Sequence, residues 1–175
     1  DCGAVRAISA VAFSSDCNYL VAACCDDEHT IKLFDLRGGV LRTSTPGGSE
    51  KVLSLCFSNS STIKILQAGV NHFRIHTYNG LDLVTKIGKW NGNKKSVITC
   101  CKPLPLAAEG GFEFIMCLPT GSLAVVNRDE VSIAQCIPGL NNEPVTAMDT
   151  ILVKEATAEE PPMFNVIIGG GNSMI

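Results

Sequence analysis

Apolar runs of four to six residues recur along this chain, and turn-forming residues separate them. Four of the runs follow one another at a spacing in the mid-forties, and each opens a unit of the same shape. These runs are Ser9–Phe13, Ser54–Phe57, Ile98–Cys101 and Val145–Asp149. No window places apolar residues at i, i+3, i+4 and i+7, so the pattern predicts strands and not helices. The chain is therefore predicted to be all-β.

Alternation of apolar and polar residues divides each unit into short strands. Turn residues lie between them; Gly38-Gly39 and Asn79-Gly80 both tolerate the positive φ of a tight hairpin. The predicted strands are Ile8–Phe13, Tyr19–Cys25, Thr30–Asp35 and Val40–Thr43, then Val52–Phe57, Ile63–Ala68, His72–Tyr78 and Leu81–Ile87, then Val97–Cys101, Phe112–Cys117, Ser122–Asn127 and Val131–Cys136, and finally Val145–Val153 and Phe164–Gly169.

A period in the mid-forties with four antiparallel strands per unit is typical of a β-propeller blade. The predicted blades are approximately 1–45, 46–90, 91–140 and 141–175, the last one incomplete. A propeller closes its ring with four or more blades. We therefore expect residues 1–175 to be a fragment of one β-propeller, about three and a half blades of a larger ring.

The net charge of −3 gives the chain as a whole no electrostatic reason to bind a polyanion. No apolar run approaches the roughly 18 residues that a membrane span needs. We expect no nucleic-acid partner, no membrane partner and no small-molecule substrate.

Nine cysteines are a high and odd number for this length, and most of them lie inside apolar strand patterns. The adjacent pairs Cys24-Cys25 and Cys100-Cys101 lie on predicted strands, where neighbours point to opposite faces, so neither pair can chelate one metal jointly. We interpret the cysteines as reduced, buried small hydrophobes, which implies a reducing compartment. Zinc binding and disulfides are the alternatives.

Motifs of catalysis are missing from the sequence. It contains no G-x-S-x-G, no H-E-x-x-H and no phosphate loop with its Lys-Ser/Thr, and His76 has no ligand-type neighbour at metal-binding spacing. We predict no enzyme activity, no catalytic residue, no metal site and no cofactor. A structural role is predicted instead for Asp26, Asp27, His29, Asp35 and His72, because side chains of these types bond to backbone groups in turns.

The stretch from Val21 to Asp35 resembles a WD-repeat blade in which Phe34-Asp35 stands for the usual Trp-Asp. Two features are similar to the echinoderm microtubule-associated protein-like (EMAP-like) family. One is the longer acidic turn of this stretch, and the other is the order of the segments that follow it: Ala68–Ile75, Asn79–Leu81, Lys86–Gly88 and Ile98–Cys100. The resemblance covers most of residues 10–126. In the second and third units, the residues at the positions equivalent to Phe34-Asp35 are His76-Thr77 and Val126-Asn127.

Membership of that family would imply a microtubule-associated scaffold, with tubulin, microtubules or microtubule-associated proteins as partners. It would also imply a location in the cytoplasm and cytoskeleton, with an axoneme or another stable microtubule array as a natural setting. The alternative is a generic WD-repeat interaction platform in a trafficking or regulatory complex.

A basic stretch between the second and third units is the candidate contact. It holds Lys86, Lys89, Lys94 and Lys95 around Trp90, and it contains no acidic residue. Microtubule surfaces are acidic, so a basic loop with an aromatic anchor suits them. The alternative is a solvated loop whose Trp90 packs between blades.

Overall fold

The computed structural model describes residues 6–105, 111–138, 145–154, 157 and 163–170. They form strands throughout, and no helix is assigned in these ranges. The prediction of an all-β chain built from four-stranded antiparallel sheets is confirmed.

Three sheets have four strands each, and every strand pairs with its neighbour in sequence. Blade 1 comprises β1 (Ile8–Phe13), β2 (Tyr19–Cys24), β3 (Ile31–Asp35) and β4 (Val40–Thr45). Blade 2 comprises β5 (Val52–Phe57), β6 (Lys64–Gly69), β7 (Phe73–Tyr78) and β8 (Leu83–Ile87). Blade 3 comprises β9 (Cys100–Pro103), β10 (Phe112–Cys117), β11 (Leu123–Asn127) and β12 (Ser132–Ile137). A fourth sheet pairs β13 (Val145–Lys154) with β14 (Met163–Gly170).

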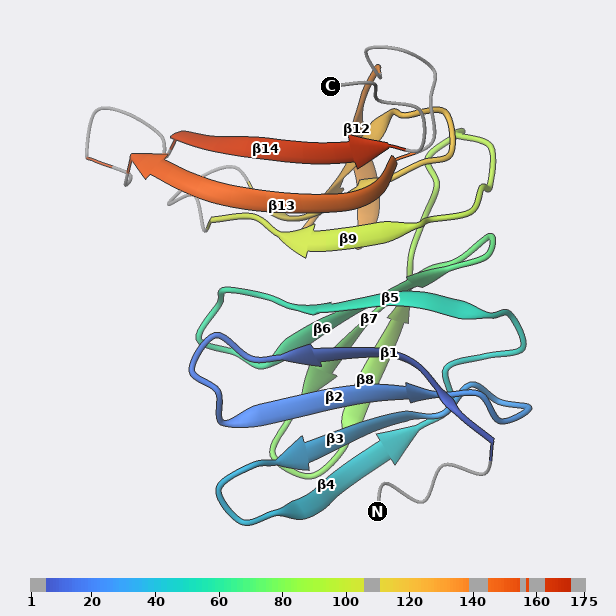
Figure 1. Cartoon of the computed structure of the whole chain (residues 1–175), viewed down its shortest axis with the longest axis vertical. Coiled ribbons are helices and arrows are strands. Elements are labelled where there is room, and N and C mark those ends of the chain that lie inside the picture. Colours follow the sequence, from blue (N-terminus) through green and yellow to red (C-terminus); the bar gives the residue numbers. More distant parts are fainter. Residues whose placement is uncertain (1–5, 106–110, 139–144, 155–156, 158–162, 171–175) are drawn as a thin grey trace.

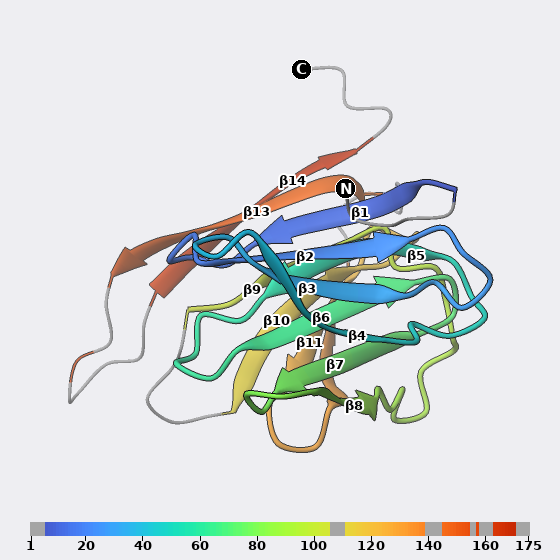
Figure 2. The same cartoon turned by 90° about the horizontal axis from the view of Figure 1, so that it is seen from below.

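The first strands of the sheets lie next to one another. β1 contacts β5, β5 contacts β9, and β9 contacts β13. Figure 1 shows these four strands following one another up the molecule, and Figure 2 shows the remaining strands of each sheet fanning away from them. The sheets therefore stack face to face around a common side, which is the arrangement of successive propeller blades.

Three hydrophobic seams hold the stack together. The first seam, between blades 1 and 2, contains Ile31, Leu33 and Ile65. The second, between blades 2 and 3, contains Leu66 and Phe73 together with residues of β10 and β11. The third packs Ile115, Cys117 and Val125 of blade 3 against Val145 and Met148 of β13. Successive strand residues point to opposite faces, so Ile65 and Leu66 serve different seams. Fully burying one such side chain stabilises the fold by about 1.5–3 kcal/mol.

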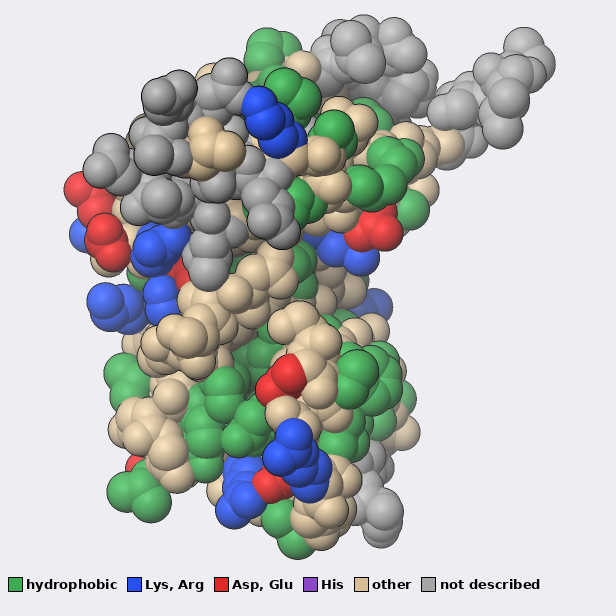
Figure 3. All heavy atoms as spheres, turned by 90° about the vertical axis from the view of Figure 1, so that its left-hand side faces the viewer, with side chains coloured by type: hydrophobic (Ala, Val, Ile, Leu, Met, Phe, Trp, Pro, Cys, Tyr) green, Lys and Arg blue, Asp and Glu red, His purple; other side chains and the backbone are tan. Residues whose placement is uncertain are grey.

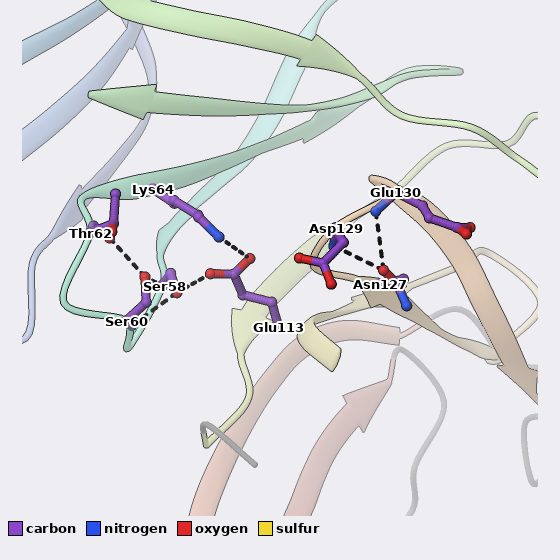
Figure 4. Close-up of polar contacts among 8 residues, drawn as sticks. All are labelled: Ser58, Ser60, Thr62, Lys64, Glu113, Asn127, Asp129 and Glu130. Atoms are coloured by element: carbon purple, nitrogen blue, oxygen red, sulfur yellow. Dashed lines mark hydrogen bonds and ion pairs between the residues drawn. The ribbon is translucent and has the colours of Figure 1, made fainter. Parts of the chain in front are cut away.

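The turn after the third strand is the same in every blade. One side-chain oxygen, from Asp35, Asn79 or Asn127, accepts hydrogen bonds from the backbone N–H groups two and three residues later. Figure 4 shows the Asn127 example. Asp and Asn are the residues that build such turns. Asp35 pairs with the first residue of β2, and Thr77 pairs with the first residue of β6, so the strand register supports the placement of the Phe34-Asp35 equivalent at His76-Thr77. In blade 2 the turn itself begins two residues later, at Asn79.

Candidate interaction surfaces

The four lysines of the basic stretch are all exposed. Lys86 lies on β8, and Lys89, Lys94 and Lys95 lie in the connection from β8 to β9. None of the four makes a salt bridge within the part of the chain that the structure describes. A fifth lysine, Lys102, lies apart from them on β9 and pairs with Asp149 at 3.1 Å. The surface formed by Lys86, Lys89, Lys94 and Lys95 is called the basic loop below.

Trp90 does not lie on this surface. Its side chain is 8% exposed and meets the ring of Phe73 edge-on, with centroids 5.6 Å apart. Of the two arrangements considered from the sequence, the structure has the packed one. Trp90 therefore packs the loop against the second seam, and the four lysines are its exposed basic side chains.

The basic loop is held by backbone hydrogen bonds at both ends. At its start, Lys89 N–H donates to Val131 O and Ile133 N–H donates to Lys89 O, both at 2.9 Å, which ties the loop to blade 3. At its end, Asn71 N–H donates to Ser96 O at 3.1 Å and Ile98 N–H donates to Gly69 O at 2.9 Å. A loop fixed in this way loses little conformational freedom when a partner binds.

The three aspartates among the turn residues singled out in the sequence make local side-chain contacts, whereas His29 Nδ1 is buried without a hydrogen-bond partner among the described residues. Asp26 accepts from Thr30 N–H at 2.8 Å, and this bond holds the pKa of Asp26 below its usual range. Asp27 pairs with Arg6 at 3.0 Å at an exposed position. His29 adopts φ of 47°. Asp35 pairs with Arg42, whose hydrogen bond is the main cause of the lowered pKa of Asp35.

The other two histidines, His72 and His76, belong to a row of hydrogen-bonded side chains in blade 2 that is called the polar thread below. Thr85 Oγ1 is hydrogen-bonded to His76 Nδ1 at 2.9 Å, and His76 Nε2 donates to Gln67 Oε1 at 2.8 Å. Gln67 Nε2 in turn donates to Gly47 O at 2.7 Å and to His72 Nε2 at 2.8 Å, and His72 Nδ1 donates to Val70 O. His72 Nε2 must be an unprotonated acceptor for the Gln67 NH₂ group, so His72 is neutral in this arrangement, whereas the Thr85 hydroxyl can either donate to or accept from His76 Nδ1. Burial accordingly lowers the pKa of both histidines, that of His76 to about 4.

A buried ion pair across the second seam was missed by the sequence analysis. Glu113 of β10 is fully buried. Its carboxylate forms a salt bridge with Lys64 Nζ of β6 at 3.1 Å and accepts a hydrogen bond from Ser58 Oγ at 2.6 Å. Figure 4 shows the carboxylate between these two groups of blade 2. The available signal was one acidic residue inside the apolar run Phe112–Cys117.

A concave groove of about 590 Å³ follows the first strands of the sheets. Its walls include Phe13, Ser54, Asn59 and the Lys102–Asp149 pair. Among the described residues, no three His, Cys, Asp or Glu side chains gather closely enough to hold a metal ion. The described residues also contain no helix with the length and hydropathy of a membrane span.

The face of blade 1 that points away from blade 2 carries a row of apolar side chains. Phe13, Leu20, Phe34 and Leu41 are directly paired across the four strands, and Phe13 and Leu41 are 61% and 48% exposed. Figure 3 shows hydrophobic side chains gathered over the lower part of the molecule, where blades 1 and 2 lie. In a ring of blades, such a face packs against another sheet.

No family model and no curated protein sequence matches this chain. Among solved structures, the chain is similar to the β-propeller domain of Cps50 (Swd1) from Myceliophteria thermophila, with a TM-score of 0.63 at 14% sequence identity. The match covers 84% of this chain and 48% of that domain, so the chain spans about half of that propeller's length. This likeness confirms the predicted β-propeller fold and carries no family assignment.

Proposed function

We propose that this chain is part of a non-catalytic scaffold that binds microtubules through the basic loop. The β-propeller fold itself supports a protein-interaction platform, because rigid sheets display loops at fixed positions. The observation that carries the finer proposal is the basic loop: four exposed lysines without acidic neighbours in sequence, one near the end of β8 and three on the connection after it, which is held to blades 2 and 3. The EMAP-like resemblance points to the same partner, whose surface is acidic.

The physical basis of recognition is charge complementarity on a preformed loop. Lysines at the rim of an interface accelerate association with an acidic partner. Added salt weakens this effect, because exposed charges are already screened over a Debye length of about 8 Å at physiological ionic strength. A fixed loop limits the entropy lost on binding. The cytoplasm and the cytoskeleton, including an axoneme or another stable array, are the corresponding locations in this proposal.

The test is co-sedimentation with stabilised microtubules across a salt series. The variant changes Lys89, Lys94 and Lys95 to Glu. The matched control changes Arg6, Arg37 and Lys51 to Glu, which alters the net charge equally at exposed positions of blade 1 and of the linker before β5. We expect salt-sensitive pelleting that the loop variant loses and the control retains.

Other outcomes contradict parts of the proposal. Equal loss in both variants means that net charge and not this loop governs binding. Pelleting that neither variant alters places the contact elsewhere on the chain. No pelleting at all leaves the generic platform in a trafficking or regulatory complex. The groove beside Phe13 and Asn59 favours that second candidate, because it offers apolar and polar groups to an extended peptide.

A further inference from the structure

Two pairs of thiols occupy opposite faces of the short strand β9. Cys100 is directly paired with Cys117 of β10 in the sheet register, and the two thiols are hydrogen-bonded to each other. Cys101, the next residue, points the other way into the second seam, which also contains Cys56 of β5, and its thiol donates to Ser54 Oγ at 3.3 Å. None of the eight cysteines in the described residues forms a disulfide.

The two pairs have different surroundings. Cys56 and Cys101 are 6% and 2% exposed, and burial raises the pKa of the Cys56 thiol well above its usual value. All three residues line the groove, but Cys100 is only half-buried and is therefore more accessible than Cys56 and Cys101. The interaction with Cys117 is the main cause of a lowered pKa of Cys100, and Thr99 and the charge of Lys102 act in the same direction. Thiolate character and access together decide which cysteine an oxidant attacks.

The geometry points to Cys100 as a peroxide-reactive thiol whose resolving partner is Cys117. The Cys100 thiolate attacks a peroxide oxygen, the O–O bond breaks, and the departing hydroxide takes up a proton to become water, which leaves a sulfenic acid on Cys100. Cys117 sulfur then attacks Cys100 sulfur, the S–O bond breaks, and a second water leaves with the Cys117 proton. Two thiols are oxidised to one disulfide, and one hydrogen peroxide is reduced to two waters.

The resolving step needs little movement. Residues directly opposite on antiparallel strands have Cβ atoms roughly 4.5–5.5 Å apart, and a disulfide needs roughly 3.5–4.5 Å. Both cysteines pack on the side of β13, where Cys117 Sγ lies 3.4 Å from Met148 Sδ, but Cys117 is fully buried whereas Cys100 is half-buried at the edge of the groove. Attack at Cys100 and resolution by Cys117 is therefore the favoured order.

The experiment treats the reduced full chain with limiting hydrogen peroxide, blocks the remaining thiols by alkylation, and maps the peptides. We expect a disulfide-linked peptide pair containing Cys100 and Cys117, with Cys56 and Cys101 still alkylated. Burial raises the pKa of Cys136 whereas the pKa of Cys100 is lowered, so Cys100 should be lost faster than Cys136.

Two variants separate the steps, and far-ultraviolet circular dichroism checks that each folds. Cys117→Ser should accumulate a sulfenic acid at Cys100 that dimedone captures. Cys100→Ser should leave Cys117 unoxidised. The proposal is overturned if the exposed Cys17 and Cys136 oxidise while Cys100 stays alkylated, or if Cys56 and Cys101 join at the same rate. The peptide map of the unaltered chain decides the question even if a variant does not fold.

Discussion

Acid should destabilise this fold before its carboxylates titrate, because of the polar thread in blade 2. His76 is buried and neutral, with a pKa of about 4 in the folded chain against 6.5 for an unperturbed histidine. Between those two values the unfolded chain binds a proton that the folded chain does not. Stability is therefore fully present above pH 6.5 and falls as the pH drops toward 4.

The size of the effect follows from the pKa difference. One pKa unit corresponds to about 1.4 kcal/mol, so the full depression is worth about 3 kcal/mol, of which about 2 kcal/mol is lost between pH 6.5 and 5. His72 adds to the loss in the same direction, because burial lowers its pKa as well. Asp16, Asp26, Asp35 and Asp149 have pKa values below the usual 3.8 and titrate at lower pH.

The assay is urea unfolding at pH 7, 6.5, 6, 5.5 and 5, followed by the fluorescence of Trp90, the only tryptophan. His76→Gln removes the titrating group, so its free energy of unfolding should depend less steeply on pH. Leu66→Ala is the control: it is buried in the second seam and should cost about 2–5 kcal/mol at every pH without changing the slope. Equal slopes in His76→Gln and the unaltered chain would refute the reasoning.

Two further substitutions test the packing between blades. Glu113→Ala should lower the free energy of unfolding by about 3 kcal/mol in urea titrations, because it leaves Lys64 and Ser58 at the second seam without their partner. The double variant Glu113→Leu with Lys64→Met should recover most of that loss, because it removes both charges. Gly88→Ala should cost about 1–3 kcal/mol in thermal melts, because a Cβ there would lie 2.2 Å from the buried Phe73 ring; an unchanged melting temperature would show that the ring can move aside.

The strands were readable from the sequence because a propeller blade is a local structure. Each strand pairs with its neighbour along the chain, so alternation and turn residues carry nearly all the information. The hairpin at Asn79-Gly80 is an example: Gly80 has the positive φ that its position suggested. The placement of the Trp-Asp equivalent at His76-Thr77 agrees with the strand register, but periodicity does not fix the last residue of a strand and did not show that the turn of blade 2 begins at Asn79.

Contacts between blades could not be predicted in the same way. Glu113 meets Lys64 and Ser58 from 49 and 55 positions away, and Cys117 lies opposite Cys100 across a loop whose length hides the register. Trp90 looked like a surface anchor because it stands among lysines, but only the position of Phe73 decides that it packs inward. Sequence patterns show which face of a strand is apolar and do not show which residue of the next sheet it meets.

The repeated turn after each third strand is held by one side chain, so its conformation does not depend on the exposed side chains at its tip. A single oxygen of Asp35, Asn79 or Asn127 holds the backbone, so exposed side chains at the tip, such as Leu81 at 78% exposure, are not needed for the turn, whereas Gly80 is needed for its positive φ. Three such tips recur at one-blade intervals along the same rim. The exposed side chains of each tip can therefore be substituted independently of the other two tips without disturbing the blades.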